Sequence, residues 1–204
     1  MKIIPNNENL EWNRQLFHIF LGLAIVALLM FGVLDKGTIL IILIFGITLS
    51  LLCQKTDIPV IHWLLSKFER QEDINNFPGK GTIFYFGGVY ASLALFEKDI
   101  ALASIMVLAL GDSISHIYGK YFGKIRHPFS DKKFLEGSIA GFIFGFIGAL
   151  VFARWYEAII GSFIAMVVEG VDIKIGFARI DDNLTIPIAA GAAIWALRLV
   201  LFFF

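Results

Sequence analysis

Residues 16–34 read LFHIFLGLAIVALLMFGVL, a run that contains no Lys, Arg, Asp or Glu. A helix needs about 20 predominantly apolar residues to cross the hydrocarbon core of a bilayer. Glu8, Glu11 and Arg14 precede the run, and no small-residue cleavage pattern follows it, so it does not resemble a cleavable signal peptide. We therefore expect this segment to remain in the protein as its first transmembrane helix.

Further uncharged or nearly uncharged apolar runs follow along the chain, at residues 38–53, 82–96, 100–110, 139–153, 156–168 and 184–204. Hydrophobic residues make up 58% of the 204 residues, with 21 Phe, and only 17% are charged, which is more apolar surface than a soluble domain of this size could bury. The sequence predicts an all-α polytopic membrane protein: one transmembrane domain over residues 1–204, a bundle of about seven helices. Several runs are short, so we expect flanking polar residues to face the bundle.

The basic residues are distributed unevenly between alternate connections. If the N-terminus is cytoplasmic, 13 of the 17 Lys and Arg residues fall on the cytoplasmic side and three on the other, with Arg198 in the last run. Because cytoplasmic loops are enriched in Lys and Arg, this predicts a cytoplasmic N-terminus. The long connections, residues 54–81, 113–138 and 169–183, then share the cytoplasmic face. Residues 54–81 contain an amphipathic stretch that we expect to lie at the membrane surface or against the bundle.

Overall charge and cysteine content exclude several classes of function. The formal net charge is zero, so nothing indicates a nucleic-acid partner, and the single Cys53 excludes an intrachain disulfide or a cysteine metal cluster.

The central segment, residues 111–142, reads GDSISHIYGKYFGKIRHPFSDKKFLEGSIAGF. Asp112 stands at the end of an apolar run, where an ionised carboxylate requires a partner or a cation. Helical spacing places His116 on the same face. A basic cluster and Glu136 follow, and acids that hold a metal beside bases that neutralise phosphate are typical of phosphoryl transfer. Alternatively, the basic residues only determine topology. The glycines 137, 141, 145 and 148 indicate helix packing.

Two more segments belong to the same predicted face. Residues 78–82, PGKGT, place free backbone amides and a lysine at the start of an apolar run, an arrangement that binds anions. Residues 169–187, EGVDIKIGFARIDDNLTIP, bring further carboxylates to this side. We expect both segments to converge on the basic cluster.

Together these motifs resemble the family of dolichol kinases, phytol kinases and CTP-dependent diacylglycerol kinases, over essentially the whole chain. Arg14 with His18, PGKGT, the central segment and the spacing from Glu169 to Pro187 carry the resemblance. It implies CTP as phosphoryl donor, Mg²⁺, and a membrane lipid alcohol, polyprenol-like or diacylglycerol, as acceptor. Phe134 departs from the family pattern, which has Thr or Ser there.

On this hypothesis each candidate residue has a role at a cytoplasmic site. Catalysis is assigned to Asp112, Glu136 and Lys133. Metal binding is assigned to Asp112, Glu136, Glu169 and Asp182. Nucleotide and phosphate binding are assigned to Gly79, Lys80, Gly81, Thr82, Lys120, Lys124, Lys132 and Asn183. Which carboxylate serves as base is left open, as is the oligomeric state, and a homo-oligomer is compatible with the sequence.

Two alternatives remain from the sequence. A phosphatidate cytidylyltransferase shares the glycine and carboxylate pattern of the central segment, but its characteristic C-terminal motifs do not follow Gly141. A transporter or membrane scaffold is the non-enzymatic alternative, disfavoured because no internal repeat is visible and the acids gather at one interface.

Overall fold

The computed structural model describes residues 7–56, 58–171, 174–175 and 178–203, and about 81% of the chain is helical. The elements are α1 (Asn7–Met30), α2 (Lys36–Lys55), α3 (Pro59–Phe68), α4 (Gln71–Asn76), α5 (Lys80–Leu95), α6 (Lys98–Met106), the π-helical turn η1 (Val107–Asp112), α7 (Ser113–Phe122), β1 (Arg126–His127), β2 (Ser130–Phe134), α8 (Leu135–Ala149), α9 (Trp155–Glu169), β3 (Lys174–Ile175), β4 (Ala178–Arg179) and α10 (Asp182–Phe203). The predicted helical class is confirmed.

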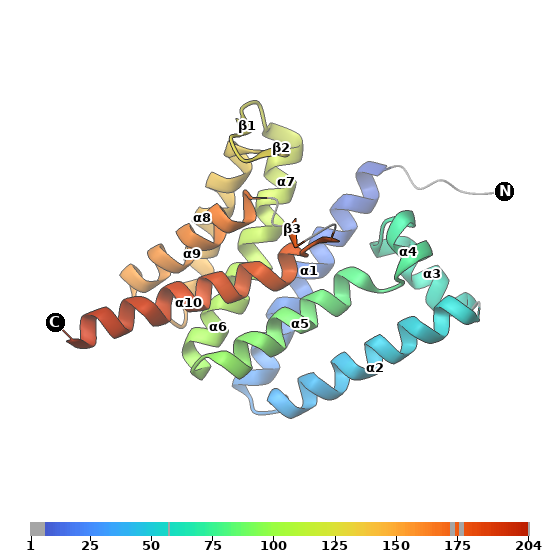
Figure 1. Cartoon of the computed structure of the whole chain (residues 1–204), viewed down its shortest axis with the longest axis horizontal. Helices are drawn as coiled ribbons and strands as arrows, with labels where there is room; N and C mark the ends of the chain where they lie inside the picture. The colour runs from blue at the N-terminus through green and yellow to red at the C-terminus, as the bar shows by residue number, and fades with distance from the viewer. Residues whose placement is uncertain (1–6, 57, 172–173, 176–177, 204) are drawn as a thin grey trace.

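A central rod made of α6, η1 and α7 organises the bundle (Figure 1). Helices α1, α8 and α10 pack around it, α9 lies against α8 and α10, and α5 lies against α10. Helix α2 packs on α5 at the edge of the molecule. In the most apolar part of the central rod 78% of the residues are buried, against 11% in α2, so the rod is the core of the bundle.

Small residues bring α8 close to the rod. A Cβ atom added to Gly137 would lie 2.6 Å from the carbonyl oxygen of Ser115, and one added to Gly141 would lie 2.7 Å from that of Gly111. Such distances are too short for any side chain, so only glycine permits this packing. The glycine pattern of α8 therefore has the packing role that the sequence indicated.

The structure corrects the predicted connection over residues 113–138. Ser113–Phe122 is helix α7, which continues the rod, and only the β1–β2 hairpin and its flanks form the connection. Asp112 consequently lies well inside the helical rod and not at its end. The helix continues because the polar side chains of Ser113 and Ser115 are buried within the bundle and do not face lipid.

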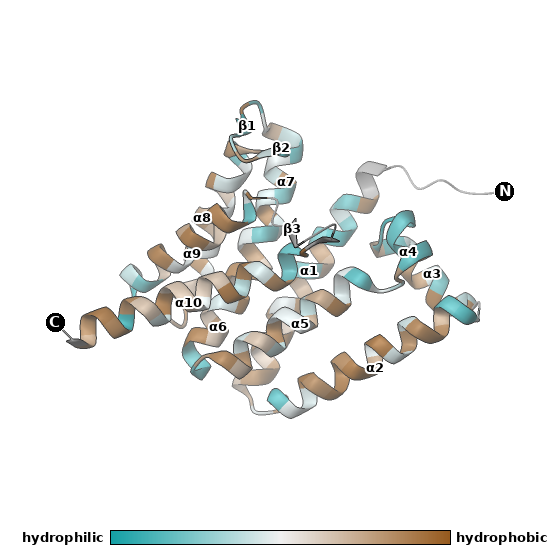
Figure 2. Cartoon of the chain, viewed as in Figure 1, coloured by the Kyte–Doolittle hydropathy of each residue, from teal (hydrophilic) through white to brown (hydrophobic). Residues whose placement is uncertain are grey.

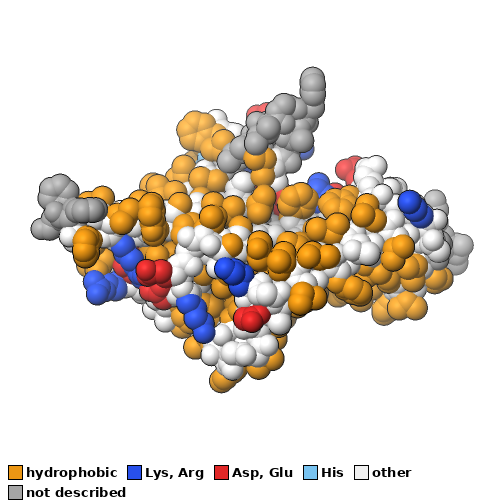
Figure 3. Space-filling model, turned by 60° about the horizontal axis from the view of Figure 1, so that its bottom comes forward, with side chains coloured by type: hydrophobic (Ala, Val, Ile, Leu, Met, Phe, Trp, Pro, Cys, Tyr) orange, Lys and Arg blue, Asp and Glu red, His pale blue; other side chains and the backbone are white. Residues whose placement is uncertain are grey.

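Four helical segments of the described chain are long and apolar enough to cross a membrane: Leu10–Met30, Lys36–Lys55, Lys98–Phe122 and Asp182–Phe202. Each predicted apolar run overlaps a helix, but α5, α8 and α9 are shorter than these four segments. The number of seven spans therefore remains a prediction. The cytoplasmic location of the N-terminus also remains a prediction. Apolar residues run along α2, α8 and α10 (Figure 2), and hydrophobic side chains cover most of the face in Figure 3. These surfaces suit contact with lipid.

Polar residues gather at one end of the bundle, around the β1–β2 hairpin, α4 and the start of α5 (Figure 2). The predicted amphipathic helix is present there as α3, which has no buried residue and exposes Val60, Trp63 and Leu64. Its position at a membrane surface stays a prediction. The two short antiparallel hairpins, β1–β2 and β3–β4, were not predicted, because ladders of so few residues leave no periodic pattern.

Candidate functional site

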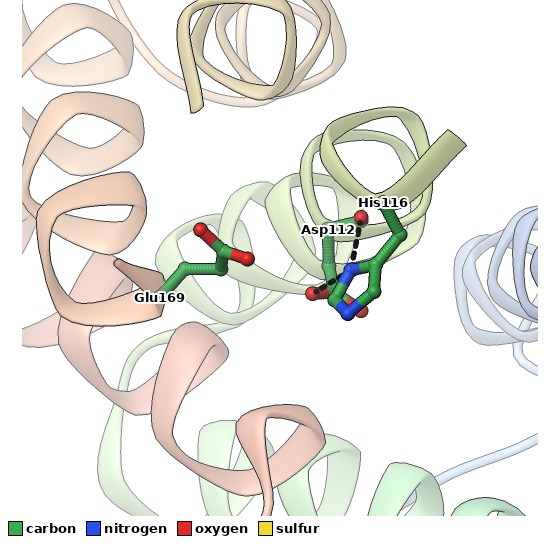
Figure 4. Close-up of side chains that lie close together, drawn as sticks. All are labelled: Asp112, His116 and Glu169. Carbon is green, nitrogen blue, oxygen red and sulfur yellow. Dashed lines mark hydrogen bonds and ion pairs between the residues drawn. The ribbon is translucent and has the colours of Figure 1, made fainter. Parts of the chain in front are cut away.

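Two carboxylates and a histidine meet where η1 passes into α7 in the central rod (Figure 4). Asp112 ends η1, His116 lies one turn further in α7, and Glu169 is the last residue of α9. Nδ1 of His116 lies 3.2 Å from Oδ1 of Asp112 and 3.0 Å from its carbonyl oxygen. Asp112 is 4% exposed and Glu169 1%. Negative charge is thus concentrated where water is largely excluded.

Lys133 joins this cluster from strand β2. Its Nζ lies 3.0 Å from Oε1 of Glu169 and 2.8 Å from Oδ2 of Asp182, and it also donates to the carbonyl oxygen of Glu169. Burial alone would lower the pKa of Lys133, but the carboxylates of Glu169 and Asp182 outweigh burial and raise it. Lys133 therefore remains a cation. We call Asp112, His116, Lys133, Glu169 and Asp182 the Asp112 group.

Several buried polar atoms around the Asp112 group have no hydrogen-bond partner among the described residues. They are Oε2 of Glu169, Oδ1 of Asn183, Oδ1 of Asp112, which has the ion-pair contact with His116, and, from α1, Nδ1 of His18. A buried polar atom without a partner is costly, so native proteins rarely keep one without a reason. Their number here indicates a place built to receive polar ligand atoms.

The carboxylates of this group have the donor chemistry that a divalent cation requires. One ligand atom each from Asp112, His116 and Glu169 lie within 4.8 Å of one another. Carboxylate oxygens are preferred by Mg²⁺, and imidazole nitrogen by later transition metals. The open oxygens of Asp112 and Glu169 therefore fit Mg²⁺, with His116 as the partner of Asp112. Asp182, also predicted as a ligand, is paired with Lys133 through Oδ2, as Glu169 is through Oε1, whereas Oε2 of Glu169 has no hydrogen-bond partner among the described residues.

Glu136 lies elsewhere. Both of its carboxylate oxygens are within 3.2 Å of the backbone nitrogen of Ile125, which donates to them, and it lines a shallow surface hollow with Phe122, Gly123 and Lys124. Hydrogen bonds from backbone N–H groups, its own and that of Ile125, lower the pKa of Glu136. At a rise of 1.5 Å per residue, Phe122 is roughly 15 Å along the helix from Asp112. The structure does not bring Glu136 into the Asp112 group.

The PGKGT segment does approach the Asp112 group, but its amides are engaged. The N–H groups of Gly79 and Gly81 donate to the carboxylate of Glu69, at 2.7 and 3.0 Å. Nζ of Lys80 lies 3.4 Å from Asp73, and the side-chain amide of Asn183 donates to the carbonyl oxygen of Gly81 at 3.4 Å. In this segment, the side chain of Lys80 is therefore the group that can contact a phosphate. Thr82 is half-buried in the first turn of α5.

The remaining basic residues lie further out. Lys120, Lys124 and Lys132 are exposed at the polar end of the molecule, whereas Lys133 enters the Asp112 group. Side chains on alternate positions of strand β2 point to opposite faces, which separates Lys132 from Lys133. Exposed lysines at this end can attract an anionic ligand without contacting the buried carboxylates.

Proteins of known sequence are similar to this chain over long stretches. An uncharacterized protein of Methanocaldococcus jannaschii is 30% identical over 186 residues, which cover 87% of this chain and 88% of that protein. CTP-dependent diacylglycerol kinase 1 of Eremothecium gossypii is 25% identical over 213 residues, covering 87% of this chain. Phytol kinase 1 of Arabidopsis thaliana is 30% identical over 127 residues, covering 54%. The chain belongs to the polyprenol and diacylglycerol kinase-like family.

The chain spans less than two thirds of the two kinases, 64% of the diacylglycerol kinase and 41% of the phytol kinase. No protein-family model matches the chain, and no solved structure matches it. The resemblance found in the sequence motifs is nevertheless confirmed by whole-chain comparison.

Sequence reasoning gave no role to two polar residues, His116 and Glu69, that lie at or beside the candidate site. His116 could have been assigned from its spacing of four from Asp112, which places both on one helix face. Glu69 gave no such signal, because its contact with Gly79 and Gly81 depends on how α3 packs.

Proposed function

We propose that this protein is a CTP-dependent lipid kinase that transfers the γ-phosphoryl group of CTP to the hydroxyl of a membrane lipid alcohol. The site would lie at the polar end of the bundle, which the basic-residue asymmetry predicts to be cytoplasmic. The observation that carries the proposal is the buried Asp112 group, in which Lys133 bridges Glu169 and Asp182 beside Asp112. The similarity to a diacylglycerol kinase and a phytol kinase supplies the reaction class.

The residues of the group would act mainly by positioning and by neutralising charge. Asp112 and Glu169 would hold Mg²⁺, which when bound offsets the negative charge of the phosphate oxygens. Lys133 and Lys80 would contact phosphate oxygens, and the amide of Asn183 would orient the nucleotide. Glu136, Lys120, Lys124 and Lys132 would shape and charge the approach to the site without contact with the reacting atoms.

The proposed reaction forms one bond and breaks one. The lipid hydroxyl oxygen attacks the γ-phosphorus, and the bond from the γ-phosphorus to the oxygen that bridges it to the β-phosphorus breaks. CDP leaves with that electron pair. The hydroxyl proton passes to a buried carboxylate of the site, since attack by an alcohol requires a base. The products are a phosphorylated lipid and CDP.

The apolar surface supports a membrane lipid as acceptor. The lipid-facing helices expose large side chains such as Phe20 on α1, Ile41 and Phe45 on α2, and Val200 on α10. A lipid held in the surrounding bilayer would bring its headgroup hydroxyl to the polar end, where the Asp112 group lies. Both a polyprenol-like alcohol and diacylglycerol meet this requirement.

Label position in CTP tests the reaction. The full chain, purified and placed in liposomes, is incubated with Mg²⁺, a panel of lipid alcohols and phosphatidate, and CTP labelled either at the α- or at the γ-phosphate. We expect γ-label in the lipid product. Transfer of α-label to phosphatidate would overturn the proposal in favour of a cytidylyltransferase, and lack of both labels would favour a non-enzymatic role.

Cysteine labelling tests the predicted orientation. In a Cys53→Ser background, cysteines at the exposed positions Val33 and Val151 should react with an impermeant reagent from outside the cell. Val33 lies between α1 and α2 and Val151 between α8 and α9, at the ends of these helices that are predicted to be external. Cysteines at the exposed positions Asn75 and Asp131 should be protected. The reverse pattern would contradict a cytoplasmic site.

A further inference from the structure

Glu69 is a buried carboxylate at the C-terminal end of α3, outside the set of residues that the sequence assigned to the site. Glu69 is only 6% exposed. Oε2 accepts a hydrogen bond from the N–H of Gly79 at 2.7 Å, and Oε1 accepts one from the N–H of Gly81 at 3.0 Å. One carboxylate thus holds two backbone amides of the turn that begins α5.

These amides stand at a helix N-terminus, where free N–H groups and the helix dipole favour an anion. In this protein the carboxylate of Glu69 is the anion at that helix N-terminus. Gly79 adopts a left-handed backbone conformation, with φ of +82°, which a residue with a side chain rarely adopts. The turn therefore has a specific shape, and the Glu69 carboxylate satisfies two donors that would otherwise be left open.

Gly81 is held from its other side as well. Its carbonyl oxygen accepts a hydrogen bond from the side-chain amide of Asn183, the residue after Asp182. Asp182 in turn pairs with Lys133. A short chain of polar contacts thus runs from the end of α3, through the peptide groups of Gly81, to the Asp112 group.

Lys80 lies between the two amides that Glu69 holds. Its ammonium group lies 3.4 Å from Oδ1 of Asp73 and interacts electrostatically with Asp181 near the start of α10. The position of the Lys80 backbone is fixed by the hydrogen bonds on both sides of it. Where its side chain can reach therefore depends on Glu69.

We propose that Glu69 is a positioning residue for the nucleotide site. Its carboxylate fixes the turn at Gly79 and Gly81 and occupies their backbone N–H groups. The phosphates are therefore contacted by the side chain of Lys80 and not by these two amides. The proposal rests on the proposed kinase function. Glu69 itself touches no substrate, and its effect is transmitted through the turn and through the contact of Gly81 with Asn183.

The test compares Glu69→Ala and Glu69→Gln with Glu72→Ala, a matched removal of an exposed carboxylate on α4. Hydrogen exchange of the peptide covering residues 77–84 reports on the turn, and steady-state kinetics report KM for CTP and for the lipid alcohol. In Glu69→Ala we expect exchange in this peptide to rise at least about tenfold and KM for CTP to rise about tenfold or more, because two charge-assisted hydrogen bonds are lost. KM for the lipid should be unchanged.

Glu69→Gln keeps one acceptor oxygen and should give an intermediate KM for CTP, which preserves the test if Glu69→Ala does not fold. Unchanged KM for CTP in the Glu69 variants of an active enzyme would overturn the positioning role alone. A fall in kcat with KM and exchange unchanged would also overturn it, because it would reflect a smaller active fraction. A wild-type chain that transfers no γ-label would instead overturn the proposed function and the positioning role with it.

Discussion

Charged groups lie towards both ends of the packed helix pair α9 and α10, and the two clusters differ in how their charges are satisfied. At the polar end lies the Asp112 group. At the other end Arg198 of α10 donates to Glu157 of α9, from Nε at 2.8 Å and from Nη2 at 3.2 Å. Nη2 of Arg198 also lies 2.6 Å from Asp99. We call Arg198, Glu157, Asp99 and the more distant Glu97 the Arg198 group.

The buried charges of the Arg198 group are satisfied by hydrogen bonds within the group and to the backbone. Glu157 is 2% exposed, but its two oxygens accept from Arg198 and from the backbone N–H of Arg154. Asp99 and Glu97 reach water. In the Asp112 group, by contrast, Glu169 keeps an oxygen with no hydrogen-bond partner in the described chain, and Asp112 and Asp182 are largely buried as well. A closed network stabilises a fold, whereas an incompletely satisfied one is suited to bind a ligand.

The largest effect that this contrast predicts is on turnover. Asp112→Asn should lower kcat/KM for γ-phosphoryl transfer by about 100-fold or more, because loss of a placed charge-stabilising group costs about 3 kcal/mol of transition-state stabilisation. The thermal stability without nucleotide should remain similar or rise, since the change removes a buried charge and is nearly isosteric. Activity close to wild type would move the catalytic centre away from the Asp112 group.

At the opposite end the expected effect is on stability. Arg198→Met should reduce the free energy of unfolding in detergent by about 3 kcal/mol, because it leaves the buried Glu157 without its cation. The folded fraction should retain its kcat/KM. Lys36→Met, which removes an exposed lysine at the start of α2, serves as the control and should be neutral. Loss of turnover without loss of stability in Arg198→Met would contradict the division of roles between the two ends.

Binding of Mg²⁺ should also distinguish the two ends, through a smaller change in the free energy of unfolding. At a concentration ten times the dissociation constant, a ligand that binds the folded state alone stabilises it by about 1.4 kcal/mol. We expect MgCl2 to stabilise the wild-type chain and the Arg198→Met variant, but not Asp112→Asn, with KCl of matched ionic strength as control. Thermal unfolding without CTP measures this. Equal stabilisation of Asp112→Asn would show that Mg²⁺ binds elsewhere.

The sequence was sufficient for the features of this site that depend on one helix. The apolar runs predicted the helices, and the spacing of four residues predicted that Asp112 and His116 share a face. The continuation of the rod beyond Asp112 was missed, because the polar residues of α7 suggested a connection. Of those polar residues, Ser113 and Ser115 are buried within the bundle, whereas Lys120 is exposed.

Features that depend on long-range packing were not accessible from the sequence. The sequence assigned catalysis to Lys133 and phosphate binding to Lys132 but predicted the partners of neither, and the fold of the β1–β2 hairpin brings Lys133 to Glu169 and Asp182. Likewise, the capture of the Gly79 and Gly81 amides by Glu69 depends on how α3 and α4 fold back onto α5. Residue spacing predicts which side chains are neighbours on one helix or strand, whereas both of these contacts join residues from different elements.

The smallest effect is expected at Glu136, the carboxylate that the sequence ranked beside Asp112. Its oxygens accept from the backbone N–H of Ile125, and a glutamine oxygen can still accept that hydrogen bond. Glu136→Gln should therefore reduce kcat/KM at most about fivefold, the cost of weakening one hydrogen bond that shapes the turn after α7. The comparison is made with Asp112→Asn under the same assay, with thermal unfolding to show that both variants are folded. A loss as large as that in Asp112→Asn would mean that the first turn of α8, which carries Glu136, closes onto the Asp112 group when substrates bind. The separation of Glu136 from the Asp112 group would then not hold in the working enzyme.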